Sequence, residues 1–250
     1  MLAHDVDGAG PRLVLVHGFT QTRAHWRGVR LALAADHQVV TVDAPGHGGS
    51  AAMAANLWAG AELLGSTGGR ATYVGYSMGA RLCLHLALAR PDLVAGLALL
   101  GATAGIDDPD QRAQRVAGDE ELARRLEEGG VDAFLAWWLR QPLFAGLGPA
   151  AADVASRRAN TANGLAASLR LAGTGTQQPL WDRLGELAMP VLAMAGAGDE
   201  RFSGQARRLV VAIGANAELA LVAGAGHSAH LEAPAAFLAA LRSWLSRHGL

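Results

Sequence analysis

The sequence predicts an α/β fold in which a mostly parallel sheet is flanked by helices and carries a helical insertion. Short runs rich in Val, Leu and Ala alternate with segments of helical periodicity along most of the chain. One long stretch, residues 106–184, has helical periodicity without a convincing strand. The chain has 250 residues, 51% hydrophobic and 17% charged, which suits a single α/β core with one insertion.

Seven strands are expected. The first is Leu2–Val6, at the sheet edge before the Gly8–Pro11 turn. Six further runs are short, apolar and bounded by turn residues, as buried strands are. They are Arg12–Val16, Gln38–Val42, Ala71–Tyr76, Leu93–Leu100, Val191–Ala195 and Glu218–Val222. Because helices separate these runs, we expect them to pair in parallel with both sheet faces covered.

Helices are expected where apolar residues recur every three or four positions. They are Trp26–Ala35, Ala54–Leu64, Met78–Ala89, Gly204–Ile213 and Pro234–His248. Residues 106–184 are charged at first and then rich in Trp and Leu. We predict that they form a helical cap over the carboxyl ends of the strands, where open α/β sheets bind ligands. Residues 1–105 and 185–250 then form the two parts of the core.

Composition excludes several functions. All 21 basic residues are arginine, balanced by 22 acidic residues and forming no long cluster, so a nucleic-acid partner is not expected. No apolar stretch approaches the roughly 20 residues of a membrane span, and the first residues lack a signal-peptide layout. Cys83 is the single cysteine, so no internal disulfide forms and it is expected to be a small buried hydrophobe. A cytoplasmic location is the simplest expectation.

A G-x-S-x-G element centred on Ser77 joins the strand Ala71–Tyr76 to the helix Met78–Ala89. A nucleophile elbow requires this strand-to-helix turn. Glycines flank the serine because a tight turn brings neighbouring backbones too close for a Cβ atom. An ordinary glycine-rich turn is the alternative interpretation.

A serine hydroxyl reacts when a histidine accepts its proton and an acid orients that histidine. Asp199 follows the predicted strand Val191–Ala195, and His227 follows the strand Glu218–Val222. Both therefore lie at the carboxyl ends of strands, as Ser77 does. We predict a triad of Ser77, His227 and Asp199.

Four further residues complete this prediction. Glu200 is a weaker candidate for the acid. His230 has no ligand spacing around it that completes a metal site, so we expect a structural role and no metal. Backbone N–H groups of Phe19 and Met78 occupy the positions of an oxyanion hole, the first in the loop after an early strand and the second directly after Ser77.

These segments resemble the α/β-hydrolase superfamily over nearly the whole chain. A narrower resemblance is to the 2-succinyl-6-hydroxy-2,4-cyclohexadiene-1-carboxylate synthases of menaquinone biosynthesis. The segments that carry it are Gly75–Arg81, Gln111–Arg115, Phe134–Phe144, Asn163–Gln177 and Gly226–His230.

The narrower resemblance implies a carbon–oxygen lyase without a cofactor, which eliminates pyruvate from a cyclohexene polycarboxylate. In such enzymes the triad abstracts a proton and forms no ester. The resemblance also implies substrate contacts from Tyr76, Arg81, Arg115, Trp138 and Arg158.

Helix geometry supports a substrate contact for Arg81 more strongly than for the other residues. Arg81 lies one helical turn after Ser77, and its side chain leans back toward the elbow, where a guanidinium binds a carboxylate with two hydrogen bonds. A salt bridge on the helix surface is the alternative. For Arg115 and Arg158 the alternative is a solvated helix of the cap. Tyr76 either binds substrate or supports the elbow.

The leading hypothesis is therefore the lyase, acting on a small anionic substrate as a monomer or small homo-oligomer. A carboxylesterase or related hydrolase of small esters would use the same triad but a more apolar cleft. A non-catalytic ligand receptor on the same scaffold is a third hypothesis, because a fold does not dictate a function.

Overall fold

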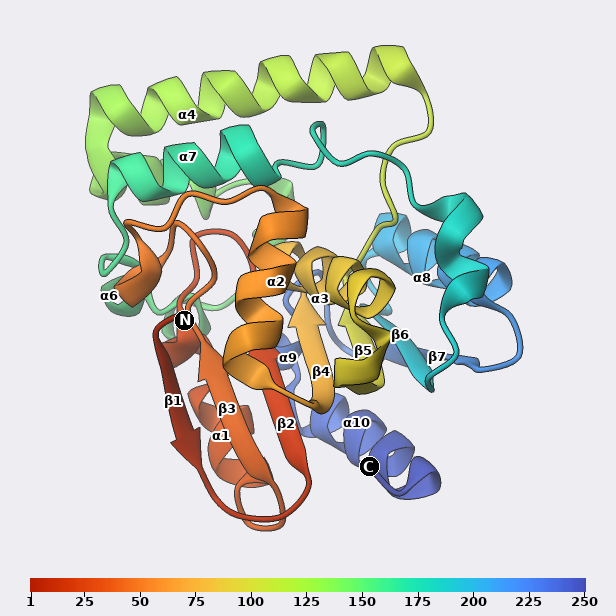
Figure 1. Cartoon of the computed structure of the whole chain (residues 1–250). Coiled ribbons are helices and arrows are strands. Elements are labelled where there is room, and N and C mark those ends of the chain that lie inside the picture. The colour runs from red at the N-terminus through yellow and green to blue at the C-terminus, as the bar shows by residue number, and fades with distance from the viewer.

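A seven-stranded sheet of order β1-β3-β2-β4-β5-β6-β7 lies at the centre of the computed structural model, which describes residues 1–250 (Figure 1). β1 pairs antiparallel with β3, and every other neighbouring pair is parallel. The strands are β1 (His4–Asp7), β2 (Arg12–Val16), β3 (Gln38–Val42), β4 (Ala71–Tyr76), β5 (Val94–Leu100), β6 (Val191–Gly196) and β7 (Ala217–Val222). The predicted α/β class is confirmed.

The edge strand begins later than predicted. β1 starts at His4 because the two preceding N–H groups bond to side chains outside the ladder: that of Leu2 to Thr67 and that of Ala3 to Ser50, each at 2.9 Å. Other predicted strand ends agree within one residue.

Helices cover both faces of the sheet because side chains alternate along each strand. Val14 and Val16 on β2 face the larger cluster, whereas Leu13 and Leu15 face the smaller one. The larger cluster is covered by α2 (Leu57–Gly68), α3 (Met78–Ala89) and α8 (Glu200–Ile213). The smaller cluster is covered by η1 (Arg23–Trp26), α1 (Arg27–Leu33), α9 (Ala229–Glu232) and α10 (Pro234–His248).

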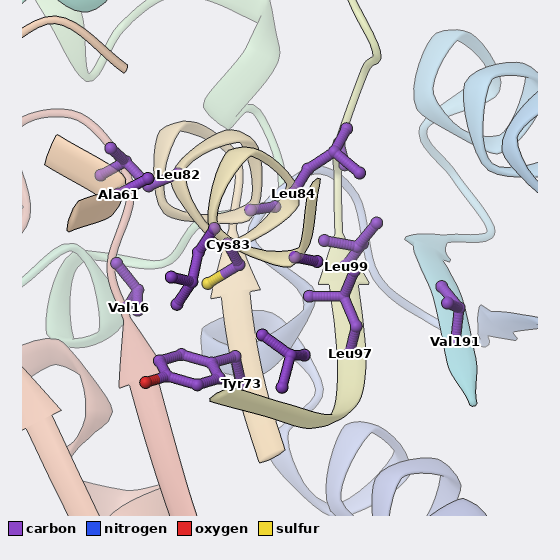
Figure 2. Packing of buried hydrophobic residues seen from close by; sticks show 14 of the residues in the cluster. Val16, Ala61, Tyr73, Leu82, Cys83, Leu84, Leu97, Leu99 and Val191 are labelled. Atoms are coloured by element: carbon purple, nitrogen blue, oxygen red, sulfur yellow. The ribbon is translucent and has the colours of Figure 1, made fainter. Parts of the chain in front are cut away.

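Cys83 belongs to the larger cluster. Figure 2 shows its side chain on α3 among labelled neighbours that include Val16 and Tyr73. It is fully buried, and this burial raises the pKa of the thiol. Cys83 therefore packs as the small hydrophobe that the sequence predicts.

Two helix starts differ from the sequence prediction by three or four residues because of capping side chains, and α1 starts one residue later than predicted. α2 begins at Leu57, where the Asn56 side chain accepts a hydrogen bond from the Ala59 N–H at 2.9 Å. α8 begins four residues earlier than predicted, at Glu200, where Asp199 caps it by accepting the Phe202 N–H at 3.1 Å. The capping role of Asp199 also fixes the direction of its carboxylate.

The chain between β5 and β6 is helical, and residues 106–184 of it are called the cap segment below. Its helices are α4 (Pro109–Trp138), η4 (Pro142–Phe144), α5 (Pro149–Ala152), α6 (Val154–Arg157), α7 (Ala162–Ala172) and the start of η5 (Trp181–Glu186). α4 and α7 lie side by side beyond the arrowheads of the parallel strands (Figure 1). Arg170 on α7 forms ion pairs with Glu120 and Glu127 on α4, at 2.8 and 2.5 Å.

α4 is interrupted at Gly130, which has φ 74°. None of the helices combines the length and the apolar character that crossing a membrane would require.

Candidate active site

Ser77 occupies a strained turn between β4 and α3, with φ 51°. Its N–H donates to the Leu100 carbonyl at 2.8 Å, which ties the turn to the end of β5. A Cβ atom at Gly79 would lie 2.3 Å from the Val16 carbonyl oxygen, and one at Gly75 would lie 2.5 Å from the Ala80 Cα. The two glycines of the sequence element are therefore required by close backbone approach, as the elbow interpretation predicts.

Ser77, His227 and Asp199 lie in one hydrogen-bonded row. His227 Nε2 is 3.2 Å from Ser77 Oγ, and His227 Nδ1 is 2.9 Å from Asp199 Oδ2. Because ionised Asp199 can only accept, Nδ1 carries the proton and Nε2 is free to accept the serine proton. Glu200 forms no hydrogen bond with His227 and lies in the first turn of α8.

The electrostatics of Asp199 suit this arrangement. Burial alone would raise the pKa of its carboxyl, but the hydrogen bonds accepted from His227 and from the Phe202 N–H bring the pKa below the ordinary value. Asp199 is therefore ionised at neutral pH and available to orient and stabilise the imidazole.

The turn Gly18–Gln21 lies directly against the serine. It is closed by the Gln21 N–H, which donates to the Gly18 carbonyl at 3.1 Å. A Cβ atom at Gly18 would lie 3.4 Å from Ser77 Cβ. Phe19 and Met78, the two residues expected to supply oxyanion N–H groups, both line the cavity that contains Ser77.

His17 holds the start of this turn. Its Nδ1–H donates to the Gly18 carbonyl at 2.8 Å, and its Nε2 accepts the Ala44 N–H at 3.0 Å. Complete burial lowers the pKa of His17 to about 3, so the ring is neutral and both nitrogens keep these roles.

A cavity of about 480 Å³ opens beside Ser77 and His227. Four arginines line it: Arg81, Arg115, Arg201 and Arg208. Two have carboxylate partners, since Arg115 pairs with Asp119 at 2.8 Å and Arg208 pairs with Asp107 at 2.7 Å.

Arg81 and Arg201 form no ion pair within 4.0 Å. Two carboxylates, those of Asp107 and Asp108, also line the cavity, so the four guanidinium groups leave its lining with an excess of positive charge.

Arg81 is buried rather than part of a surface salt bridge. Only 7% of it is exposed, and its one side-chain hydrogen bond is a long contact of 3.4 Å from Nη1 to the Gln177 side chain. Burial, with a smaller effect of neighbouring Arg115, lowers the pKa of Arg81 to about 10. The side chain is thus a protonated, poorly compensated cation that faces the cavity, as the sequence predicts.

Replacing Arg81 by methionine is expected to stabilise the protein. Because its pKa falls on folding, the protonated side chain destabilises the native state at every pH below about 10. An apolar side chain of similar length should raise the free energy of unfolding by about 1–3 kcal/mol, or Tm by about 2–4 °C per kcal/mol. Thermal unfolding of Arg81→Met, beside the exposed-site control Arg158→Met, measures this. A lower Tm for Arg81→Met would show that Arg81 stabilises the fold.

The structure corrects two expected substrate contacts. Tyr76 does not line the cavity, because it faces the α1 and α10 side of the sheet, where its hydroxyl bonds to Ser228 Oγ at 2.8 Å. The centroid of its ring lies 5.3 Å from that of His227. Arg158 also lies outside the cavity: its side chain is 60% exposed and pairs with Asp132 at 2.6 Å.

The other expected contacts are brought together. Arg115 and Trp138 both line the cavity with Arg81. Trp138 packs edge-on against Phe19, with ring centroids 5.6 Å apart. The cap segment thus contributes one wall of the site.

Sequence reasoning missed Glu232. Its carboxylate accepts the N–H groups of Gly226 and Ser228, at 2.7 and 2.8 Å, and so holds the loop on both sides of His227. The available signal was an acidic residue five positions after the candidate histidine.

Arg201 and Gln177 were also missed. Arg201 lies two residues after Asp199, the residue that caps α8, and this position was the available signal for a residue near the site. Gln177 ends a segment that the resemblance included, without a role for this residue.

His230 packs between aromatic rings, with centroids 4.4 Å from Trp26 and 4.5 Å from Tyr76. No three His, Cys, Asp or Glu side chains are grouped so that they could hold a metal ion.

The sheet order, the elbow and the histidine after the last strand define an α/β-hydrolase, and the sequence agrees: the pattern of the Alpha/beta hydrolase family matches residues 13–241. The chain belongs to this family.

Among its relatives is the 2-succinyl-6-hydroxy-2,4-cyclohexadiene-1-carboxylate synthase of Klebsiella pneumoniae, 34% identical over 94% of both chains. The synthase of the same name from Serratia proteamaculans is 32% identical, over 96% of this chain and 94% of its own. The resemblance stated from the sequence is confirmed.

Solved structures agree with the fold. MenH from S. aureus superposes with a TM-score of 0.93 at 26% identity and covers 100% of both chains. A thermophilic esterase from Thermogutta terrifontis superposes with a TM-score of 0.82 at 23% identity, over 99% of this chain and 93% of its own. The second likeness reflects the fold alone.

Proposed function

We propose that this protein is a cofactor-free carbon–oxygen lyase that forms 2-succinyl-6-hydroxy-2,4-cyclohexadiene-1-carboxylate by eliminating pyruvate from a cyclohexene polycarboxylate. The names of the relatives support the reaction. The observation that carries the proposal is the charge of the cavity, where Arg81 and Arg201 have no acidic partner beside Ser77 and His227. Guanidinium groups in a confined cavity bind carboxylates strongly.

In the proposed mechanism Ser77 is the base. His227 Nε2 accepts the hydroxyl proton while Ser77 Oγ takes a proton from a ring carbon next to a carbonyl group. The electrons of the broken C–H bond form a second ring double bond beside the one already present, and the C–O bond to the enolpyruvyl group breaks. That group leaves as an enolate and takes the proton from His227 to become pyruvate. Ionised Asp199 stabilises the imidazolium.

Negative charge develops on the substrate carbonyl oxygen as the C–H bond breaks. We assign its stabilisation to the N–H groups of Phe19 and Met78, which flank Ser77 at the cavity. Arg81 and Arg115 bind carboxylates of the substrate, and Trp138 packs against its ring.

The proposal includes the division into a core of residues 1–105 and 185–250 and a cap of residues 106–184, which encloses the substrate. It also includes a cytoplasmic location and a monomer or small homo-oligomer.

An esterase remains the second candidate, because the Ser77–His227–Asp199 row is equally suited to acyl transfer. The two reactions differ in what the cavity must hold. A neutral ester leaves Arg81 without a partner, whereas a polycarboxylate provides one. A pure receptor would not need the hydrogen-bonded row.

The purified wild-type protein is expected to release pyruvate from the enolpyruvyl cyclohexene substrate, measured by coupling to lactate dehydrogenase. Short p-nitrophenyl esters lack the carboxylates, each worth about 1.5–3 kcal/mol as a charged hydrogen-bond partner. Their kcat/KM should therefore be lower by about a hundredfold or more. Rapid ester hydrolysis without any pyruvate would assign the protein to the esterases.

A further inference from the structure

Two buried residues of the cap segment hold the turn that contains Phe19. Arg157, at the end of α6, donates from Nη1 to Thr20 Oγ1 at 2.5 Å. Asn160 donates from Nδ2 to the Thr20 carbonyl at 2.8 Å. Arg157 is 1% exposed and Asn160 is 5% exposed, so water does not compete for these bonds. The side-chain hydroxyl and the carbonyl group of Thr20 are thus both hydrogen-bonded to the cap segment.

Thr20 has a backbone conformation that needs such support. Its φ is 65° at the third position of the Gly18–Gln21 turn, where glycine or asparagine is favoured. A β-branched residue at positive φ is a strained exception, and strain of this kind persists only where the surroundings fix it. The contacts from Arg157 and Asn160 provide that fixation.

Arg157 is an unusual residue for a purely structural contact. It forms no ion pair within 4.0 Å, and its remaining bond is from Nε to the Ala152 carbonyl at 2.7 Å. Its Nη2 has no protein partner, and burial lowers the pKa of the guanidinium to about 10. The nearby carboxylate of Asp153 acts on this guanidinium only at longer range, without an ion pair. Burying a cation without a paired carboxylate destabilises the fold, which favours a role in function over one in packing.

Asn160 connects three segments. Its Nδ2 also donates to the Arg157 carbonyl at 2.9 Å, and its Oδ1 accepts the Gly48 N–H at 2.9 Å. The loop after β3, the end of α6 and the turn after β2 are therefore joined at one side chain. Phe19 also packs against α4, where its ring contacts that of Phe134 edge-on, with ring centroids 6.2 Å apart.

We propose that Arg157 and Asn160 are positioning residues that hold the Gly18–Gln21 turn with the Phe19 N–H directed at the reacting oxygen beside Ser77. This inference rests on the oxyanion role proposed for Phe19. The cap segment then does more than enclose the substrate, because it completes the oxyanion site for every substrate, charged or neutral. Losing this support lowers the rate of the chemical step and leaves substrate affinity nearly unchanged.

The test compares Arg157→Met with Arg158→Met, a matched control in the next residue, whose side chain is exposed and outside the cavity. Two quantities are measured: kcat and KM for pyruvate release, and the rate of Ser77 modification by a fluorophosphonate, followed by intact mass. The second needs no natural substrate, because the phosphonyl oxygen occupies the oxyanion site.

Arg157→Met is expected to lower kcat and the labelling rate by about ten- to a hundredfold, less than the full loss of an oxyanion donor. KM should change by less than about threefold, because the side chains that bind the substrate in the ground state are unchanged. Arg158→Met should change neither. A rise in KM alone, or equal effects of both variants, would overturn the inference.

Asn160→Asp is the second variant, in case Arg157→Met does not fold. It keeps the acceptor for the Gly48 N–H and removes the Nδ2 donor to the Thr20 and Arg157 carbonyls. It should show the same loss of kcat and labelling with unchanged KM. A normal labelling rate in folded Asn160→Asp would contradict the inference.

Thr20→Gly separates positioning from general stability. Glycine adopts positive φ without strain, so in this background Arg157→Met should lower labelling by less than about threefold, a departure from additivity. Equal losses in both backgrounds would point to a general structural role.

If wild-type protein is labelled at Ser77 but releases no pyruvate, the lyase proposal fails and this inference is still tested by labelling. If wild type is not labelled at all, the inference fails with the oxyanion site.

Discussion

Ser77→Ala is expected to lower kcat by about a thousandfold or more, with little effect on substrate binding. The hydroxyl lies 3.2 Å from His227 Nε2 beside the cavity, and no other hydroxyl is hydrogen-bonded to that histidine. His227→Ala should cause a similar loss, because neither group works without the other. The double variant should lose little more than either single variant.

Steady-state pyruvate release measures this, with Ser66→Ala as the control. Ser66 is an exposed serine on α2 that bonds only to the Glu62 carbonyl. Asp199→Asn should lose somewhat less than Ser77→Ala, since the histidine remains but its tautomer is no longer fixed. Near-normal turnover of Ser77→Ala would rule out the serine as the reacting group.

Arg81→Ala is expected to lower kcat/KM for the polycarboxylate by about thirty- to a thousandfold, equivalent to about 2–4 kcal/mol. The cause is the loss of a desolvated cation one helical turn from Ser77, with no protein carboxylate to share it. Lysine should restore only part of the activity, because one ammonium cannot form the paired hydrogen bonds of a guanidinium.

The same variants assayed with a neutral ester distinguish binding from structure. Ester hydrolysis by Arg81→Ala should change much less than pyruvate release, since the ester has no carboxylate to lose. Equal losses on both substrates would mean that Arg81 supports the elbow. Together with the higher Tm expected of Arg81→Met, a selective loss would identify Arg81 as a residue kept for binding at the expense of stability.

Much of the fold could be predicted because each strand is a short apolar run between turns, so strand ends from β2 to β7 agree within one residue. The elbow could be predicted because its glycines mark a turn where backbones approach too closely for a Cβ atom: Gly75 lies against Ala80 of the same turn, and Gly79 lies against Val16 of the neighbouring strand β2. The row of Ser77, His227 and Asp199 could be predicted from position, since all three follow parallel strands.

The errors arise where the direction of a side chain depends on tertiary packing. Tyr76 adjoins Ser77 in sequence, yet it shares the sheet face of Val74 and does not line the cavity. Arg157 and Arg158 are adjacent at the end of α6, but one is buried against Thr20 and the other is in solvent with Asp132. Sequence alone could not distinguish them, because the docking of the cap segment decides which side of this turn is covered.

The points at which the cap segment joins the core bear on how proteins of this fold diversify in evolution. It leaves after β5 and rejoins the core before η5, where the Leu180 N–H donates to the Ala104 carbonyl at 2.8 Å. Insertions whose two ends lie so close are readily exchanged during evolution, since the rest of the chain need not rearrange. One restriction follows from the bonds to Thr20: a recombined cap that lacks counterparts of Arg157 and Asn160 would inherit a new pocket over an incomplete catalytic turn. Grafting experiments that retain these two positions should therefore yield active chimaeras more often than grafts that replace the whole segment.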